Sequence, residues 1–331
     1  MNLPLFAVLL IIIALAFEFV NGFHDTANAV ATSIATKSLE PFQAIAISAI
    51  FNLIGALSGT AVALTIAKGF ASPILATQPV ILSALLSAIT WNLLTWYFGM
   101  PSSSSHALIG GLVGAIMFQS GYAVINYTSI LYKVILPMVM SPILGFAIAT
   151  LIVLVVHRML RNNTEPRKIN NLIREIQVLS TAFLSFSHGA NDAQKTMGIL
   201  TLTLFNFHLI ATPTVPQWVI FACAVCMALG TLCGGVKIIR TLSTRVAKLK
   251  PVSGLAAELS SAIILFIGSR FGMPLSTTHA VSGSIMGAGN AGGSVGVNWG
   301  VVKNMVVAWV LTFPTCMLLA GGYLYIVKLL Y

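Results

Sequence analysis

The sequence predicts an all-α polytopic membrane protein made of two inverted-topology repeats with broken helices. Composition is the first observation: of 331 residues, 57% are hydrophobic and only 7% are charged, with a mean hydropathy of +0.96. Soluble domains carry roughly 25% charged residues, so this chain lacks the charge to cover a water-facing surface. Apolar blocks of about 20 residues alternate with short polar segments and leave room for about ten helical elements.

An internal repeat is the second observation. The segment from Phe19 to Asp25 aligns with the segment from Phe186 to Asp192, and a longer stretch before His106 aligns with one before His279. Such self-similarity indicates two copies of one structural unit. The predicted divisions are a first transmembrane repeat at 1–160, a short cytoplasmic linker at 161–167 and a second, inverted repeat at 168–331.

Loop charge predicts how the repeats are oriented. The net charge of +10 indicates cytoplasmic loops and not nucleic-acid binding, because a basic excess marks the cytoplasmic side of membrane proteins. Segments 157–174 and 237–250 each carry five basic residues, and both are expected in the cytoplasm. The first-half counterpart of the latter segment, 68–79, carries a single lysine. Corresponding loops then lie on opposite sides, which predicts inverted repeats with both termini outside.

The apolar spans follow in order along each half. An inverted second half requires an odd number of crossings per half. Five crossings satisfy this requirement, and so do three crossings with a re-entrant hairpin at 80–119, for which 254–292 is the second-half counterpart. The expected first-half spans are 4–35, 42–67, 80–98, 102–121 and 130–157. Inverted repeats with broken helices are typical of secondary transporters, which hold their substrate near the membrane midplane.

The chain has only two aspartates, Asp25 and Asp192, and they occupy the same position of the repeat. A carboxylate at membrane depth costs at least ~2.5 kcal/mol, so such residues are usually functional. Polar neighbours interrupt the apolar helix and free backbone groups and helix ends to bind ions. The alternative is a hydrogen-bond cluster that only locks the halves together. These neighbours are Asn21, His24, Thr26 and Asn28 in the first copy, and His188, Asn191, Gln194, Lys195 and Thr196 in the second.

A second repeated motif places hydroxyl groups after a proline. Its copies run from Pro101 to His106 and from Pro274 to His279. Proline suits a first helical turn, and serine or threonine suits a helix N-cap, so each copy predicts a helix that begins inside the membrane. Free N–H groups and hydroxyls at such a helix end form an anion site. An ordinary helix cap at the lipid interface is the alternative.

Together the two motifs offer donors for an anion and ligands for a cation, as a symporter of an anion with Na⁺ or H⁺ requires. The paired halves predict alternating access to one midplane site. Glu18 and Glu258 are the other acids expected at membrane depth. Each is either a carrier of a coupling proton or a neutral, hydrogen-bonded packing residue.

At these motifs the sequence resembles the inorganic phosphate transporter (Pit) family of secondary carriers. The resemblance rests on four motifs in order, at 21–29, 99–106, 188–198 and 273–279. It implies an inverted-repeat carrier for orthophosphate in the cell inner (plasma) membrane, driven by Na⁺ or H⁺. Many members have asparagine where this chain has His24, and the histidine form is familiar among bacterial carriers thought to use protons and to accept metal-phosphate complexes. Some members carry glutamate at the position of Asn52, so one cation ligand of those members is missing here.

The motifs and the resemblance together predict the roles of individual residues. The expected cation-coupling residues are Asp25, Asp192, Asn28, Asn191, His24 and Glu258, of which Asp25, Asn28, Asn191 and Asp192 would hold Na⁺. The expected phosphate-binding residues are Ser103, Ser104, Ser105, Ser276, Thr277, Thr278, Thr26 and Lys195. Lys195 either neutralises phosphate charge or extends towards the membrane interface.

Sulfate or another tetrahedral oxyanion is the main alternative substrate. Phosphate keeps at least one proton at neutral pH and sulfate keeps none, so nearby carboxylates favour phosphate. A hydrolase is disfavoured because no activated nucleophile accompanies the His-Asp pairs, so neither an enzyme nor a cofactor is expected. A passive anion channel, the third alternative, would show no obligatory cation coupling. The expected partners are inorganic phosphate, H⁺ or Na⁺ and the lipid bilayer, with a homo-oligomer left open.

Overall fold

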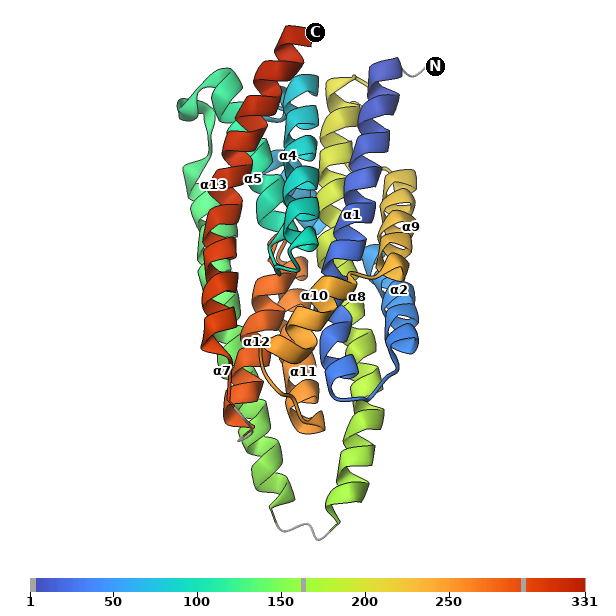
Figure 1. The fold of residues 1–331 in the computed structure, drawn as a ribbon. Helices are drawn as coiled ribbons and strands as arrows, with labels where there is room; N and C mark the ends of the chain where they lie inside the picture. Colours follow the sequence, from blue (N-terminus) through green and yellow to red (C-terminus); the bar gives the residue numbers. More distant parts are fainter. Residues whose placement is uncertain (1–3, 162–164, 293–295, 331) are drawn as a thin grey trace.

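The structure, a computed structural model, describes residues 4–161, 165–292 and 296–330. In these ranges the chain is almost entirely helical, and the long helices lie side by side along one axis (Figure 1). Within the described residues, five helices are long and apolar enough to cross a membrane, and the number is seven if each of two bent helix pairs forms one span. The predicted all-α multi-pass class is therefore confirmed. Of the predicted linker, residues 162–164 lie outside the described part of the chain.

The first half begins with α1 (Leu5–Ala35), which runs from the end of the molecule that carries both termini towards the opposite end (Figure 1). The chain returns through α2 (Pro41–Ala56) and α3 (Ala61–Lys68), which form a bent pair at 66°. The other helices are α4 (Gln78–Tyr97), α5 (Ser104–Ser120), α6 (Tyr127–Ile130) and α7 (Leu136–Leu160). Short 3-10 turns occupy Pro73–Leu75 and Tyr122–Val124, and a π-helical segment occupies Leu131–Ile135.

The second half begins with α8 (Pro166–Asn206), which runs opposite to α1 (Figure 1). A second bent pair, at 63°, joins α9 (Gln217–Cys233) to α10 (Val236–Arg240) and the π-helical segment Thr241–Arg245. The remaining helices are α11 (Pro251–Arg270), α12 (Thr277–Ala291) and α13 (Trp299–Leu330). Each half thus has a long helix, a bent pair, a shorter helical pair and a long final helix, in that order.

The shorter pairs, α4–α5 and α11–α12, are helical hairpins. They approach from opposite ends of the molecule, and their tips, residues 98–103 and 271–276, meet near its middle (Figure 1). Ser105 donates a hydrogen bond to the carbonyl of Leu275 at 3.1 Å, and Thr278 donates to the carbonyl of Ser102 at 2.8 Å. The two tips thus end against each other inside the molecule. This arrangement supports the sequence model with three crossings and one re-entrant hairpin per half, which stays a prediction.

Local chemistry explains where each hairpin turns. Gly99 and Gly272 both have φ +65°, a left-handed conformation that ends α4 and α11 and favours glycine. The second helix then begins with a serine cap: Ser103 accepts a bond from the His106 N–H at 3.2 Å, and Ser276 caps α12 in the same way at 3.3 Å. The predicted caps are therefore present. The prolines lie before the caps, in the turns, and not in the first helical turns as expected.

The apolar core is divided at the level of the hairpin tips. One buried cluster contains Leu10, Leu85 and Leu112, towards the end that carries the termini, and the other contains Val30 and Ile285, towards the opposite end. Between them lies a buried layer of serine, threonine, asparagine, histidine and aspartate side chains. Buried polar groups need partners, so this layer is held by a dense hydrogen-bond network.

Each bent pair packs against the hairpin tip of the other half. Lys237 of α10 donates to the Tyr97 carbonyl at 3.0 Å, and Thr241, which begins the π-helical segment after α10, donates to the Gly99 carbonyl at 2.8 Å. The Lys237 ammonium also lies 4.4 Å from the centre of the Tyr97 ring. At the other tip, a Cβ on Gly272 would lie 3.0 Å from the Ala61 carbonyl of α3. The hairpin of one half is therefore coupled to the broken span of the other.

The contact at Lys237 gives a local prediction. The Lys237→Met substitution removes both the donor and a cation–π interaction worth about 0.5–1 kcal/mol. We expect backbone amides of residues 97–103 to exchange hydrogen roughly two- to fivefold faster, measured by mass spectrometry. The matched control is Lys303→Met, which changes an exposed lysine on α13. Unchanged exchange in Lys237→Met would show that α10 does not restrain this tip.

Candidate functional site

The Asp25 carboxylate lies where α1 meets the N-terminus of α5. Its Oδ1 lies 2.7 Å from His24 Nδ1, and Ser104 donates to its Oδ2 at 2.9 Å. His24 Nε2 lies 3.1 Å from the hydroxyl of Thr95 on α4, which in turn lies 2.8 Å from the Ser102 hydroxyl. The first aspartate is thus joined to its own hairpin through a hydroxyl and a histidine.

The Asp192 carboxylate occupies the equivalent place between α8 and α12. Lys195 donates to its Oδ1 at 2.5 Å, Asn191 donates to the same oxygen at 3.0 Å, and Thr277 donates to Oδ2 at 3.1 Å. The Lys195 ammonium also donates to the Ser105 hydroxyl, on the first hairpin, and to the Leu275 carbonyl at 3.1 Å. Asp192 therefore contacts the second hairpin directly, through Thr277, and the first hairpin indirectly, through the buried Lys195.

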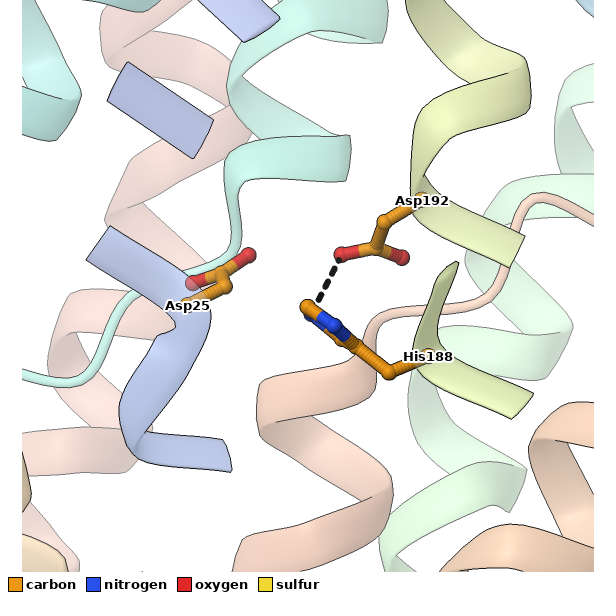
Figure 2. Close-up of side chains that lie close together, drawn as sticks. All are labelled: Asp25, His188 and Asp192. Atoms are coloured by element: carbon orange, nitrogen blue, oxygen red, sulfur yellow. Dashed lines mark ion pairs between the residues drawn. The ribbon is translucent and has the colours of Figure 1, made fainter. Parts of the chain in front are cut away.

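The two carboxylates and one histidine converge on a single point (Figure 2). Ligand atoms of Asp25, His188 and Asp192 all lie within 4.8 Å of one another, and all three side chains are buried. His188 Nε2 lies 3.3 Å from Asp192 Oδ2, and its Nδ1 lies 3.0 Å from Asn52 Oδ1, which orients the ring. Carboxylate oxygens and an imidazole nitrogen are ligands for a cation, so this triad is a candidate cation site.

Hydroxyls and helix ends adjoin the triad and form the candidate anion site. Ser104 is the first residue of α5 and Thr277 is the first residue of α12, so free N–H groups of both helices point towards the same layer. Asn28 donates to the Thr278 hydroxyl at 3.0 Å and to that of Thr277 at 3.4 Å. The structure thus brings donors for an anion next to ligands for a cation.

The whole site is closed to solvent. Asp25 is 2% exposed, Asp192 is 0% exposed and Lys195 is 1% exposed. The serines and threonines that begin α5 and α12 are also buried. The carboxylates, the lysine and the hydroxyls of the site are therefore all buried together. Lys195 does not extend to the membrane interface, which removes that alternative from the sequence interpretation.

Several predicted site residues make different contacts from those expected. The Thr26 hydroxyl donates to the carbonyls of Gly22, at 2.7 Å, and Thr231, at 3.3 Å, so it belongs to the contact between α1 and α9. Ser103 and Ser276 use their hydroxyl oxygens as helix caps. As caps, Ser103 and Ser276 only accept, so their O–H groups remain available as donors. Phosphate contacts from the Thr26, Ser103 and Ser276 side chains stay predictions. Asn28 and Asn191 adjoin the triad, Asn28 through Thr277 and Asn191 through Asp192, and their role as cation ligands stays a prediction.

Glu258 lies in a hydrogen-bonded cluster that is separate from the triad of Asp25, His188 and Asp192. Its carboxylate accepts bonds from Thr32 at 2.7 Å, Gln177 at 2.9 Å and Thr181 at 3.1 Å, and also from Ser180. This arrangement fits a packing role that joins α1, α8 and α11. A coupling role for Glu258 stays a prediction. Glu18 accepts a bond from Thr196 and lies two turns before Asp25 on α1.

The sequence did not predict the contacts that several polar residues make around the site. Thr95 and Ser102 contact His24, and Asn52 orients His188. Gln194 accepts a bond from the Val62 N–H at 2.7 Å and so caps α3 from α8. Isolated polar residues within apolar spans are the available signal, because a polar side chain there usually has a specific partner. The identity of each partner depends on how the helices pack, which has no local signal in the sequence.

Comparison with known proteins agrees with this geometry. The family model described as the phosphate transporter family matches residues 21–320. A probable low-affinity inorganic phosphate transporter of Bacillus subtilis is 45% identical over 316 residues, with 94% of each chain covered. A protein of the same description from Rhizobium meliloti is 44% identical over 314 residues, covering 94% of this chain and 93% of the relative.

A solved structure described as "The sodium-dependent phosphate transporter" has the same fold. It superposes with a TM-score of 0.87 at 25% identity, covering 99% of this chain and 100% of its own. The relatives are named as transporters, so the prediction of a multi-pass plasma-membrane carrier and not an enzyme is confirmed. The chain belongs to the phosphate transporter family.

Proposed function

We propose that the chain is a secondary active transporter that carries inorganic phosphate across the plasma membrane together with H⁺ or Na⁺. The observation that carries the proposal is the shared buried layer in which two carboxylates meet two helix N-termini. An anion carrier coupled to a cation needs both sets of groups in one closed site. The names of the relatives support phosphate, the sodium dependence of the protein with the solved structure supports Na⁺, and the contact between His24 and Asp25 supports H⁺.

Phosphate suits this site better than sulfate. The hydroxyls of Ser104 and Thr277 now donate to Asp25 and Asp192, and in the substrate complex they would donate to phosphate oxygens. A carboxylate then accepts the proton that phosphate keeps at neutral pH. Sulfate has no such proton, so its oxygens would face unprotonated carboxylates and repel them.

Alternating access follows from the same arrangement. The two hairpins enter from opposite ends and meet at the site, so withdrawal of either tip opens the site to one side only (Figure 1). The bent pairs pack against the opposing tips, which would couple the movement of the two halves. The division into inverted repeats at 1–160 and 168–331 is part of this proposal and is supported by the opposite directions of α1 and α8.

Hydroxyl removal tests the anion site. Ser104→Ala and Thr277→Ala each remove one donor to a charged ligand, a contact worth about 1.5–3 kcal/mol. We expect the apparent Km for phosphate to rise roughly tenfold or more in each variant. Thr212→Ala, in an exposed loop, is the control and should leave Km unchanged. Normal Km values in both site variants would place phosphate elsewhere.

Substrate and coupling ion are tested by uptake into proteoliposomes. Initial rates of labelled phosphate uptake are measured under a Na⁺ gradient and under a pH gradient in turn, with unlabelled sulfate as competitor. The proposal expects uptake driven by at least one gradient and weak competition by sulfate. Stronger inhibition by sulfate than by phosphate would assign another oxyanion as the substrate, and uptake independent of both gradients would indicate a channel.

A further inference from the structure

The two copies of the aspartate motif differ at the third position after the acid. Asp25 is followed there by Asn28, whereas Asp192 is followed by Lys195. Three residues later on a helix lies on the same face as the acid. The internal repeat therefore replaces a neutral amide in one half with an ammonium group in the other, at the site itself.

The contacts of the Lys195 ammonium are those of a bound cation. Its Nζ lies 2.5 Å from Asp192 Oδ1 and 3.1 Å from the Leu275 carbonyl, and it also bonds the Ser105 hydroxyl. Carboxylate, carbonyl and hydroxyl oxygens are the groups that hold hard metal cations in proteins. The side chain is 1% exposed, so the charge stays inside the protein. The ammonium therefore fills the oxygen-lined place beside Asp192.

The first half has no such fixed charge. Asn28 donates to Thr278 and Thr277, while Asp25 contacts His24 and Ser104. Within the described ranges, no lysine or arginine forms an ion pair with Asp25. The ammonium of Lys195 is paired with Asp192, so among the described residues Asp25 is the carboxylate of the pair that has no lysine or arginine beside it. A buried charge without a partner is costly, so Asp25 is the carboxylate that calls for a mobile cation.

We propose that Lys195 is a tethered cation that permanently occupies the second-half counterpart of the cation site, so that transport is coupled to one mobile monovalent cation held at Asp25. This inference rests on the proposed phosphate symport. It assigns Lys195 to the carboxylate Asp192 and not, as the sequence suggested, to the phosphate. Replacing the lysine by the first-half residue should recreate a second site for a mobile cation.

The Lys195→Asn substitution is the test, and Lys303→Asn, at an exposed position of α13, is the matched control. Thermal unfolding of purified protein is followed as choline is replaced by Na⁺, and phosphate uptake is measured over the same series. In Lys195→Asn we expect the rate of phosphate uptake to depend on the Na⁺ concentration with a reaction order one higher than in the wild type. The unfolding midpoint should rise by about 3 °C or more with Na⁺, because a ligand that binds the folded state stabilises it.

The outcomes separate this inference from the proposed function. A Lys195→Asn protein with the wild-type Na⁺ dependence would overturn it, and so would one that stays unfolded even in high Na⁺, because Na⁺ should replace the ammonium. Folding of the variant in Na⁺ but not in choline would support it. If wild-type protein carries no phosphate, the proposed function fails, while the Na⁺ dependence of unfolding still decides the role of Lys195.

Discussion

Asp25→Asn and Asp192→Asn should each lower cation-driven phosphate uptake by at least about thirtyfold. Each substitution keeps the side-chain shape but removes the charge at the point where the triad converges. Loss of one partner of a buried charge contact costs roughly 2–5 kcal/mol, which corresponds to at least this factor. In Asp192→Asn the Lys195 ammonium also loses its partner, so this variant should in addition unfold at a lower temperature.

Both variants are measured in proteoliposomes at matched protein density. Glu175→Gln is the control because it also neutralises one acid, at an exposed position of α8 outside the site. We expect the control to carry phosphate at the wild-type rate. Full uptake by both aspartate variants would show that these carboxylates do not couple transport.

Gly189→Ala should have the largest effect on stability. A Cβ at Gly189 would lie 2.1 Å from the Asn52 carbonyl of α2, and one at Gly55 would lie 2.0 Å from the Phe186 carbonyl of α8. The two helix backbones thus touch through glycine on both sides, a common form of packing in membranes. Forcing them apart should cost about 1–3 kcal/mol and should displace Asn52 from His188.

The measurement is the thermal unfolding midpoint in detergent, followed by phosphate uptake. Gly322→Ala on α13 is the matched control, because a Cβ there meets nothing within 4 Å. We expect the control to unfold at the wild-type temperature and Gly189→Ala to unfold several degrees lower. Equal unfolding midpoints for Gly189→Ala and the wild type would mean that α2 and α8 can move apart without loss of stability.

Much of the architecture was predictable from sequence because membrane helices are recognisable by their composition. The spans expected at 4–35, 80–98 and 102–121 agree with α1, α4 and α5 to within a few residues. The requirement for an odd number of crossings per half did not distinguish five crossings from three crossings with one hairpin. The contacts of Ser105 and Thr278 across the tips support the hairpin, and such long-range contacts have no local signature.

The site was predictable in part, for a different reason. Repetition identified Asp25 and Asp192, and helix capping identified the N-termini of α5 and α12. The phosphate role predicted for Thr26 stays a prediction: its hydroxyl bonds the Thr231 carbonyl of α9, because neighbouring residues on a helix point in different directions. The contribution of His188 depends on its position on α8 relative to α1, which only packing determines.

The proposed mechanism requires that phosphate moves together with a cation. This coupling is measured most directly as the steady-state ratio of internal to external phosphate in proteoliposomes, with the membrane potential held at zero and a Na⁺ or H⁺ gradient imposed. We expect a ratio above one that rises with the gradient of the coupling cation and falls to one when an ionophore dissipates it. A ratio that stays at one under both gradients, while phosphate still equilibrates quickly, would contradict symport.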